Sequence, residues 1–184
     1  MYRTDLAIER MEMLDETGDV SDDTGEIKGV TLEKTDYGEG VISTLISITN
    51  LSGVKALGKP MGNYITIETK SVLEEDEDVK GIVIKAVSEE LRKLIKFHYN
   101  LKVLVAGLGN RTVTPDSLGP EAASKLKITR HLFIMFEADG DDEMSNVSCI
   151  IPGVSATTGM ETADIIKKTV EVVKPEVLVV IDSL

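Results

Sequence analysis

Residues 101–120, LKVLVAGLGNRTVTPDSLGP, contain the pattern that decides the fold class. The run 101–106 is apolar and rich in β-branched side chains, which predicts a buried strand. It leads directly into the glycine-rich turn Gly107-Leu108-Gly109-Asn110. Pro120, followed by good helix formers, predicts a helix that begins shortly after Asp116. A strand, a turn and a helix in this order form the basic unit of α/β proteins.

The same alternation continues toward the end of the sequence. Short apolar runs predict strands at 132–136, 147–151 and 177–181. Between the last two, Thr158 and Glu161 have capping-box spacing and predict the start of another helix. We therefore expect an α/β fold whose mainly parallel or mixed sheet is flanked by helices, with right-handed crossovers.

The first part of the sequence has a different character. Residues 10–40 are acidic and weakly periodic, which predicts loops and one possible hairpin. Strands are expected at 41–48 and 64–68. A long amphipathic helix is expected from residue 79, with one apolar face formed by Val83, Val87, Leu91, Leu94 and His98. We divide the chain into an N-terminal region, 1–40, and an α/β domain, 41–184.

Charge and composition exclude several classes of partner. The formal net charge of −12 opposes direct binding to nucleic acid and to anionic membranes. No apolar run approaches the roughly 20 residues that span a bilayer. The single cysteine, Cys149, cannot form an internal disulfide, which fits a reducing intracellular compartment, and its place in an apolar run indicates packing rather than nucleophilic chemistry.

Two acidic residues stand where α/β proteins place their sites. Asp116 follows the turn after one predicted strand, and Asp182 directly follows another. Taken singly, Asp116 could cap a helix and Asp182 could be a strand-end residue that meets solvent. If the two strands are neighbours, both residues lie at the same edge of the sheet, beyond the carboxyl ends of its strands. Two carboxylates held close together share a proton and can activate water, which predicts an acid-pair site.

Other kinds of site have less support. Gly107 and Gly109 could belong to a nucleotide-binding turn, but the third glycine of that fingerprint is replaced by Thr112. The acidic run 139–143 does not follow the spacing of a calcium loop. We therefore predict no metal and no cofactor, and keep a small-molecule or nucleotide binder as a further hypothesis.

Four stretches of the sequence closely resemble the germination protease family of spore-forming bacteria. They are RTDLAIE at 3–9, LVAGLGNRTVTPDSLGP at 104–120, IPGVSATTGMET at 151–162 and VIDSL at 180–184. The resemblance implies an atypical aspartic endopeptidase, in the core of the forespore or spore, that degrades small acid-soluble spore proteins at germination. It implies that Asp116 and Asp182 are catalytic. It also leads us to expect that the site loop is supported by Gly107, Gly109, Asn110 and Gly119.

The resemblance further implies a homotetramer made as a zymogen that trims its own N-terminus. The family cleaves after an acidic residue that precedes an aliphatic residue and alanine, and Asp5-Leu6-Ala7 fits this preference. We therefore predict self-cleavage between Asp5 and Leu6, which makes 1–40 a prosegment followed by an acidic loop region. This prosegment of five residues is shorter than the resemblance leads us to expect.

A more distant likeness connects the chain to hydrogenase-maturing endopeptidases, of a related phosphorylase- or hydrolase-like α/β fold. It rests on the Gly-x-Gly-Asn turn at 107–110 and the Asp-x-x-Gly at 116–119. Because family members continue well past Leu184, we expect a domain that is truncated at its C-terminus. Two alternatives stay open: a catalytically inactive fragment that retains the fold and the assembly surface, and a hydrogenase-maturation-like endopeptidase.

Overall fold

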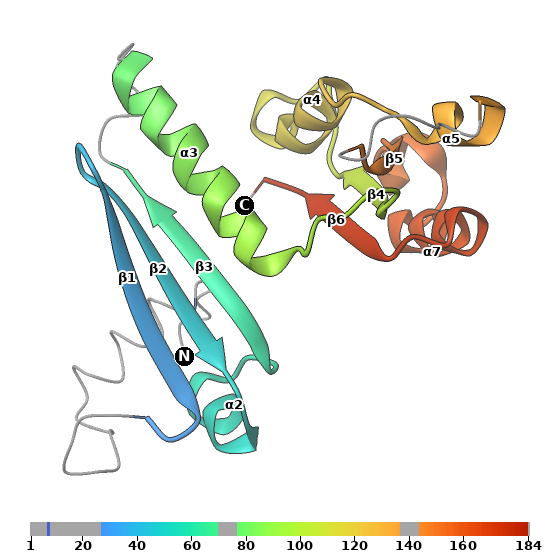
Figure 1. The fold of residues 1–184 in the computed structure, drawn as a ribbon. Helices are drawn as coiled ribbons and strands as arrows, with labels where there is room; N and C mark the ends of the chain where they lie inside the picture. Colours follow the sequence, from blue (N-terminus) through green and yellow to red (C-terminus); the bar gives the residue numbers. More distant parts are fainter. Residues whose placement is uncertain (1–6, 8–26, 70–76, 137–143, 184) are drawn as a thin grey trace. The chain divides into compact units, whose positions relative to one another are not determined.

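The computed structural model describes residue 7 and residues 27–69, 77–136 and 144–183 (Figure 1). The chain folds as two compact units, Met1–Leu94 and Ile95–Leu184, and each contains a three-stranded sheet. The boundary that we predict after residue 40 lies beside the turn between the first two strands of the first unit. Among the described helices, none is both long and apolar enough to cross a membrane.

The first unit is an antiparallel sheet with strand order β1-β2-β3 and two helices. Its elements are β1 (Val30–Gly38), β2 (Val41–Ile48), α2 (Leu51–Leu57), β3 (Gly62–Glu68) and α3 (Glu77–Leu94). The strands expected at 41–48 and 64–68 and the long helix are confirmed. Within the region 10–40, where loops and one possible hairpin were expected, the described residues contain the strand β1, whose hairpin partner is β2.

The two faces of β2 belong to two separate apolar clusters. Val41 packs with residues of α3, including Val79 and Ala86. Alternate residues of the same strand, Ile46 and Ile48, belong to a cluster with residues outside α3. Because successive side chains of a strand point to opposite faces, α3 covers one face of the sheet and the second cluster lies on the other.

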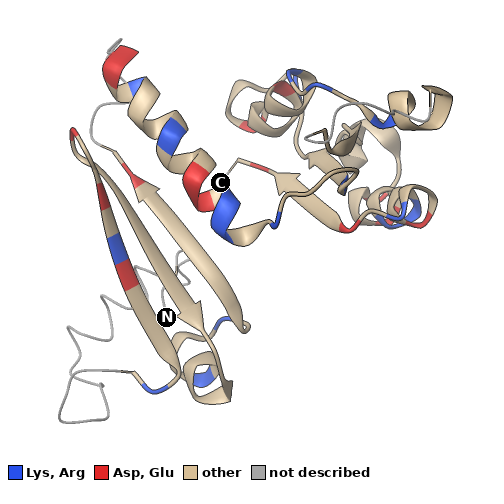
Figure 2. Ribbon diagram, in the orientation of Figure 1, with Lys and Arg blue, Asp and Glu red and all other residues tan. Residues whose placement is uncertain are grey.

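The apolar face predicted for α3 is wrong except at Val83, which packs against the cluster of Val41, Val79 and Ala86. Acidic and basic residues are interspersed along this helix (Figure 2). The residues that it buries most deeply are Val79, Ala86 and Glu90. Of the predicted face, Val87, Leu91 and Leu94 are 40%, 41% and 47% exposed, and His98 lies beyond the end of the helix. The predicted face and the face that is actually buried both contain apolar residues at helical spacing. The small side chain of Ala86, on the buried face, allows the helix to approach β2 closely.

Glu90 is buried because hydrogen bonds compensate its charge. The hydroxyl of Tyr37 donates to Glu90 Oε1 over 3.0 Å, and Lys93 Nζ donates to the same oxygen over 2.9 Å. Burial acts to raise the pKa of Glu90, but the hydrogen bonds from Lys93 and Tyr37 and the positive charge of Lys93 help to lower the pKa below its ordinary 4.5. Burial, together with the bond to Glu90, raises the pKa of Tyr37 to about 12. This network joins β1 and α3.

The second unit is a parallel sheet with strand order β5-β4-β6. Its strands are β4 (Lys102–Gly107), β5 (Asn146–Ile150) and β6 (Val177–Ile181). Its helices are the 3₁₀ helix η1 (Thr114–Asp116), α4 (Leu118–Ser124), α5 (Arg130–Phe136), α6 (Ser155–Thr158) and α7 (Thr162–Val173). The fold class is therefore α/β, with the predicted parallel sheet in this unit and an antiparallel sheet in the other.

The strand expected at 132–136 is wrong, because these residues belong to α5. Just before α5, the backbone N–H of Thr129 donates to Val147 O in β5, and Thr129 Oγ1 accepts from the Val147 N–H. The N–H of Leu132 then donates to Thr129 O, which closes a helical turn instead of continuing the pairing. Five consecutive apolar residues fit a short buried strand and a short helix equally well, so the pattern could not decide between them.

The capping box predicted between Thr158 and Glu161 is also wrong. Thr158 is the last residue of α6, and Gly159, at φ +70°, ends that helix in a left-handed conformation. The next helix, α7, starts at Thr162, and its N-cap Glu161 makes no side-chain capping bond. Thr158 Oγ1 instead accepts a hydrogen bond from the backbone N–H of Met160.

Candidate active site

The two strands that precede the candidate aspartates are neighbours, which is the condition that the sequence left open. β4 and β6 pair in parallel, with Ala106 opposite Val180 and Gly107 opposite Ile181. The carboxyl ends of parallel neighbours lie at one edge of the sheet. The loop that contains Asp116 and the residue Asp182 therefore both begin at this edge.

A backbone hydrogen bond continues this pairing past the end of β4. The N–H of Leu108 donates to Ile181 O over 2.8 Å. The acceptor belongs to the residue directly before Asp182, and the donor lies inside the loop that leads to Asp116. A main-chain hydrogen bond thus holds the loop that leads to Asp116 against the residue directly before Asp182.

Gly119 is the point where three segments meet. A Cβ atom on this residue would lie 2.2 Å from Leu108 O and 2.4 Å from Ile181 O. Similarly, a Cβ atom on Gly107 would lie 2.3 Å from Gly119 O. Only residues without a side chain allow the start of α4 to approach the ends of β4 and β6 so closely. These contacts support the expectation that both glycines shape the site.

Gly109 and Asn110 hold Asp116 in place. Gly109 adopts φ +115°, and a Cβ atom there would lie 2.1 Å from Asp116 O. The backbone N–H of Asn110 donates both to Asp116 O over 2.9 Å and to Asp116 Oδ2 over 2.8 Å. The half-buried carboxyl group of Asp116 is therefore oriented by the turn that follows β4.

Thr112 is a site residue that the sequence reasoning missed. Asn110 Oδ1 accepts hydrogen bonds from the backbone N–H of Thr112 over 3.0 Å and from its hydroxyl over 2.8 Å. These bonds fix the loop whose backbone contacts Asp116. The spacing Asn-x-Thr is typical of such side-chain-to-backbone turns, and this signal could have identified Thr112.

A salt bridge that the sequence did not suggest fastens the same loop to α4. Arg111 Nε lies 2.7 Å from Glu121 Oε1. Both side chains are about half exposed, so water and salt screen the pair and its contribution to stability is small. The salt bridge nevertheless connects the loop directly to the helix that follows Asp116.

Asp182 is held more loosely than Asp116. Its side chain is exposed, and Oδ1 accepts a hydrogen bond from the backbone N–H of Ser183 over 2.9 Å. Asp5 and Leu6, the predicted self-cleavage site, lie outside the described residues. Within the described ranges, no group of three His, Cys, Asp or Glu residues is arranged to hold a metal ion.

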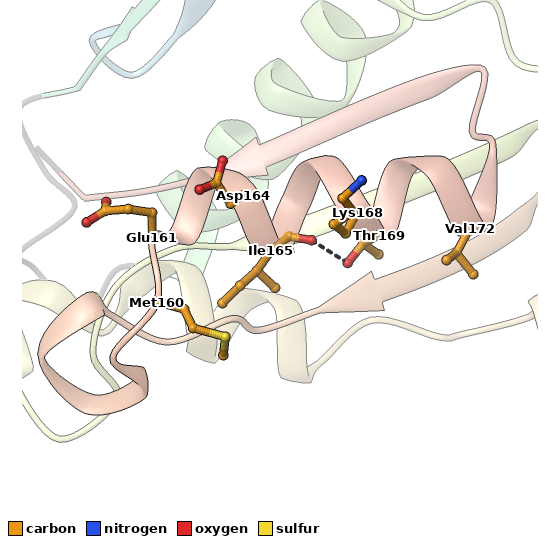
Figure 3. Close-up of a pocket in the computed structure, with 7 residues that line it drawn as sticks. All are labelled: Met160, Glu161, Asp164, Ile165, Lys168, Thr169 and Val172. Atoms are coloured by element: carbon orange, nitrogen blue, oxygen red, sulfur yellow. Dashed lines mark hydrogen bonds between the residues drawn. The ribbon is translucent and has the colours of Figure 1, made fainter.

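An open groove of about 650 Å³ runs along α7, apart from both aspartates (Figure 3). Met160, Ile165 and Val172 supply its apolar surface. Charged side chains at its margin are Glu161, Asp164 and Lys168. Because neither candidate aspartate lines this groove, its size does not make it the candidate active site.

The geometry thus defines a class of protein: an α/β protein in which two aspartates follow adjacent parallel strands and one is fixed by a glycine-rich turn. Comparison with known families then identifies the family. The family model described as germination protease matches residues 7–184. The chain belongs to the germination protease family.

Individual relatives agree with this assignment. The chain is 41% identical over 182 residues to a germination protease of Caldanaerobacter subterraneus, covering 99% of the chain and 53% of the relative. It is 39% identical to that of Clostridium tetani, with coverage of 99% and 54%. It is 38% identical to that of Priestia megaterium, with coverage of 99% and 50%. The chain spans about half the length of these curated relatives.

Proposed function

We propose that this chain carries the catalytic aspartates of an endopeptidase that hydrolyses small acid-soluble spore proteins when a spore germinates. The observation that carries the proposal is the pairing of β4 with β6, extended by the bond from Leu108 to Ile181. Because of this pairing, the loop that contains Asp116 and the residue Asp182 both begin at the same edge of the sheet. Family membership supports a peptidase rather than a nucleotide binder.

The chemistry follows from two carboxyl groups in different protonation states. One ionised carboxylate takes a proton from a water molecule, whose oxygen adds to the scissile carbonyl carbon. The protonated partner donates a hydrogen bond to the carbonyl oxygen and stabilises its developing negative charge. The carboxyl group that took the proton from water then gives it to the leaving nitrogen as the carbon–nitrogen bond breaks. Asn110 and Gly109 serve this reaction by fixing the orientation of Asp116.

The substrate and partners form part of the same proposal. The protein acts in the spore core, assembles as a homotetramer and removes its own first residues by cutting between Asp5 and Leu6. The family suggests, as the substrate, the small acid-soluble proteins that coat spore DNA. The net charge of −12 separately disfavours contact with the DNA itself.

Substitution of each aspartate tests the proposal. The protein should cut a small acid-soluble spore protein at defined positions, and Asp116→Asn or Asp182→Asn should each abolish the cuts, as followed by mass spectrometry. Asp164→Asn is the matched control, because Asp164 is an exposed residue of α7 with only a surface ion pair to Lys167. Undiminished cleavage by both site variants would refute the assignment of these residues.

A second candidate is favoured by the length of the relatives. Because the chain spans about half of each of them, it could act as a non-catalytic piece that keeps the fold and the assembly surface. Defined cleavage by the 184-residue chain, lost in the two site variants, would exclude this candidate. A folded chain that assembles but never cleaves would favour it.

A further inference from the structure

A third loop leaves the sheet at the same edge as the two candidate aspartates. β5 pairs with β4 in parallel, and Ile150, the last residue of β5, lies opposite Ala106. On its other side, Ala106 lies opposite Val180. The three strands therefore end within one residue of the same level. Residues 151–159, which we call the β5 loop, thus start beside the loop that contains Asp116.

Threonine hydroxyl groups order the β5 loop from within. Thr157 and Thr158 each donate a hydrogen bond to Val154 O, over 2.9 and 3.2 Å. Just after the loop, the hydroxyl of Thr162 donates to Gly153 O over 3.1 Å. A loop that is ordered beforehand loses little conformational entropy when it binds a partner.

The exposed surface of the β5 loop carries no charge. Its exposed side chains are those of Ile151, which is 41% exposed, Ser155, Ala156 and Thr157. The sequence from 151 to 160 contains no Asp, Glu, Lys or Arg. Such a surface suits the main chain and the small or apolar side chains of a polypeptide.

We propose that the β5 loop is a binding subsite for the substrate polypeptide, two or three residues away from the bond that is cut. The subsite rests on the proposed function, because that function places the bond at Asp116 and Asp182. β5 and β6 lie on opposite sides of β4, so their ends are roughly 10 Å apart at the usual spacing of strands. An extended chain covers this distance in about three residues. A substrate that crosses the three strand ends therefore reaches the β5 loop with its second or third residue from the cut.

Amide chemical shifts test this contact without requiring cleavage. The isotope-labelled 184-residue chain with Asp116→Asn is titrated with a small acid-soluble spore protein, up to about 1 mM. We expect the amide signals of residues 151–159 to shift together with those of the loop around position 116. Shifts confined to other segments, or no shifts at all, would overturn the inference.

Ser155→Lys adds a readout that general damage to the fold would not produce. Lysine at this exposed position should favour substrates with Asp over those with Lys at the second or third residue from the cut, by about two- to fivefold in kcat/KM. The same exchange farther along the substrate should have no effect. Ser124→Lys is the matched control, because Ser124 is exposed and lies at the end of α4 remote from Asp116, and it should leave the preference unchanged.

The results distinguish failure of the subsite from failure of the proposed function. Cleavage that requires both aspartates, with the same preference in Ser155→Lys as in the parent chain, would overturn the subsite alone. Shifts at the β5 loop in a chain whose cleavage survives both aspartate substitutions would count against the proposed function alone. For a chain that does not cleave, the chemical shifts decide.

Discussion

Gly119→Ala should disrupt the junction on which the candidate site depends. The new Cβ atom would lie 2.2 Å from Leu108 O, 2.4 Å from Ile181 O and 2.6 Å from Leu108 N. All three contacts are with backbone atoms, which cannot rotate away as a side chain would. Restoring an ordinary contact requires a movement of about 1 Å, and overpacking of this kind costs about 1–3 kcal/mol. We expect the upper end of that range, because two strand ends must move.

Gly81→Ala is a matched control with the opposite expected sign. Gly81 lies in the interior of α3, and a Cβ atom there would meet nothing within 4 Å. Alanine in an open helix interior stabilises by about 0.5–1 kcal/mol relative to glycine. Both variants can be compared with the parent chain by urea denaturation followed by circular dichroism, with amide hydrogen exchange at Leu108 reporting the junction itself. A cost below about 1 kcal/mol for Gly119→Ala, with unchanged exchange at Leu108, would refute the steric reasoning.

Two further predictions concern buried polar groups. The pKa of Glu90 is lower in the folded chain than its ordinary 4.5, so the unfolded chain binds protons first and the stability of the first unit should fall as the pH drops below 4.5. The pKa of Tyr37 is raised to about 12, so stability should also fall as the pH rises from 10 toward 12. Urea midpoints across pH test both. Tyr37→Phe should remove the alkaline loss and also reduce the acid loss, because the Tyr37 hydroxyl is one of the groups that lower the pKa of Glu90. Thr129→Val should cost about 1–3 kcal/mol in urea denaturation, because the Val147 N–H loses its acceptor and the hydroxyl's bond to Ser145 O disappears; a midpoint equal to that of the parent would contradict this.

The sequence predicted what local pattern determines. The β-branched runs and the glycine-rich turn gave the strands β2 and β4, and the order of strand and helix gave a parallel pairing in the second unit. It failed for α5, where the hydrogen bonds of Thr129 with Val147 and the turn from Leu132 N–H to Thr129 O replace continued strand pairing. It also failed for the face of α3, which depends on how closely Ala86 can approach β2. Both failures depend on contacts between residues far apart in the sequence.

In the candidate site, too, the sequence could predict the features that depend on local pattern but not those that depend on contacts between distant residues. Asp116 and Asp182 could be found from their places after predicted strands, and the turn Asn110-x-Thr112 had a readable spacing. The bond from Leu108 to Ile181 had no local signal, because it exists only once β4 and β6 have taken one particular register. The steric role of Gly119 follows from that register as well, since its close neighbours come from both segments.

The two aspartates are therefore positioned by different means, and this difference bears on how the pair is assembled. Asp116 is fixed within its own turn, by the Asn110 N–H and by the close approach of Gly109. Asp182 is exposed, and its place is set mainly by the last residues of β6. A one-residue slip of β6 against β4 would break the bond from Leu108 to Ile181, move Asp182 by roughly 3.3 Å and turn its side chain to the opposite face. The geometry of the pair thus depends on strand register, and Gly119, which contacts both strand ends, is the residue that most directly fixes it.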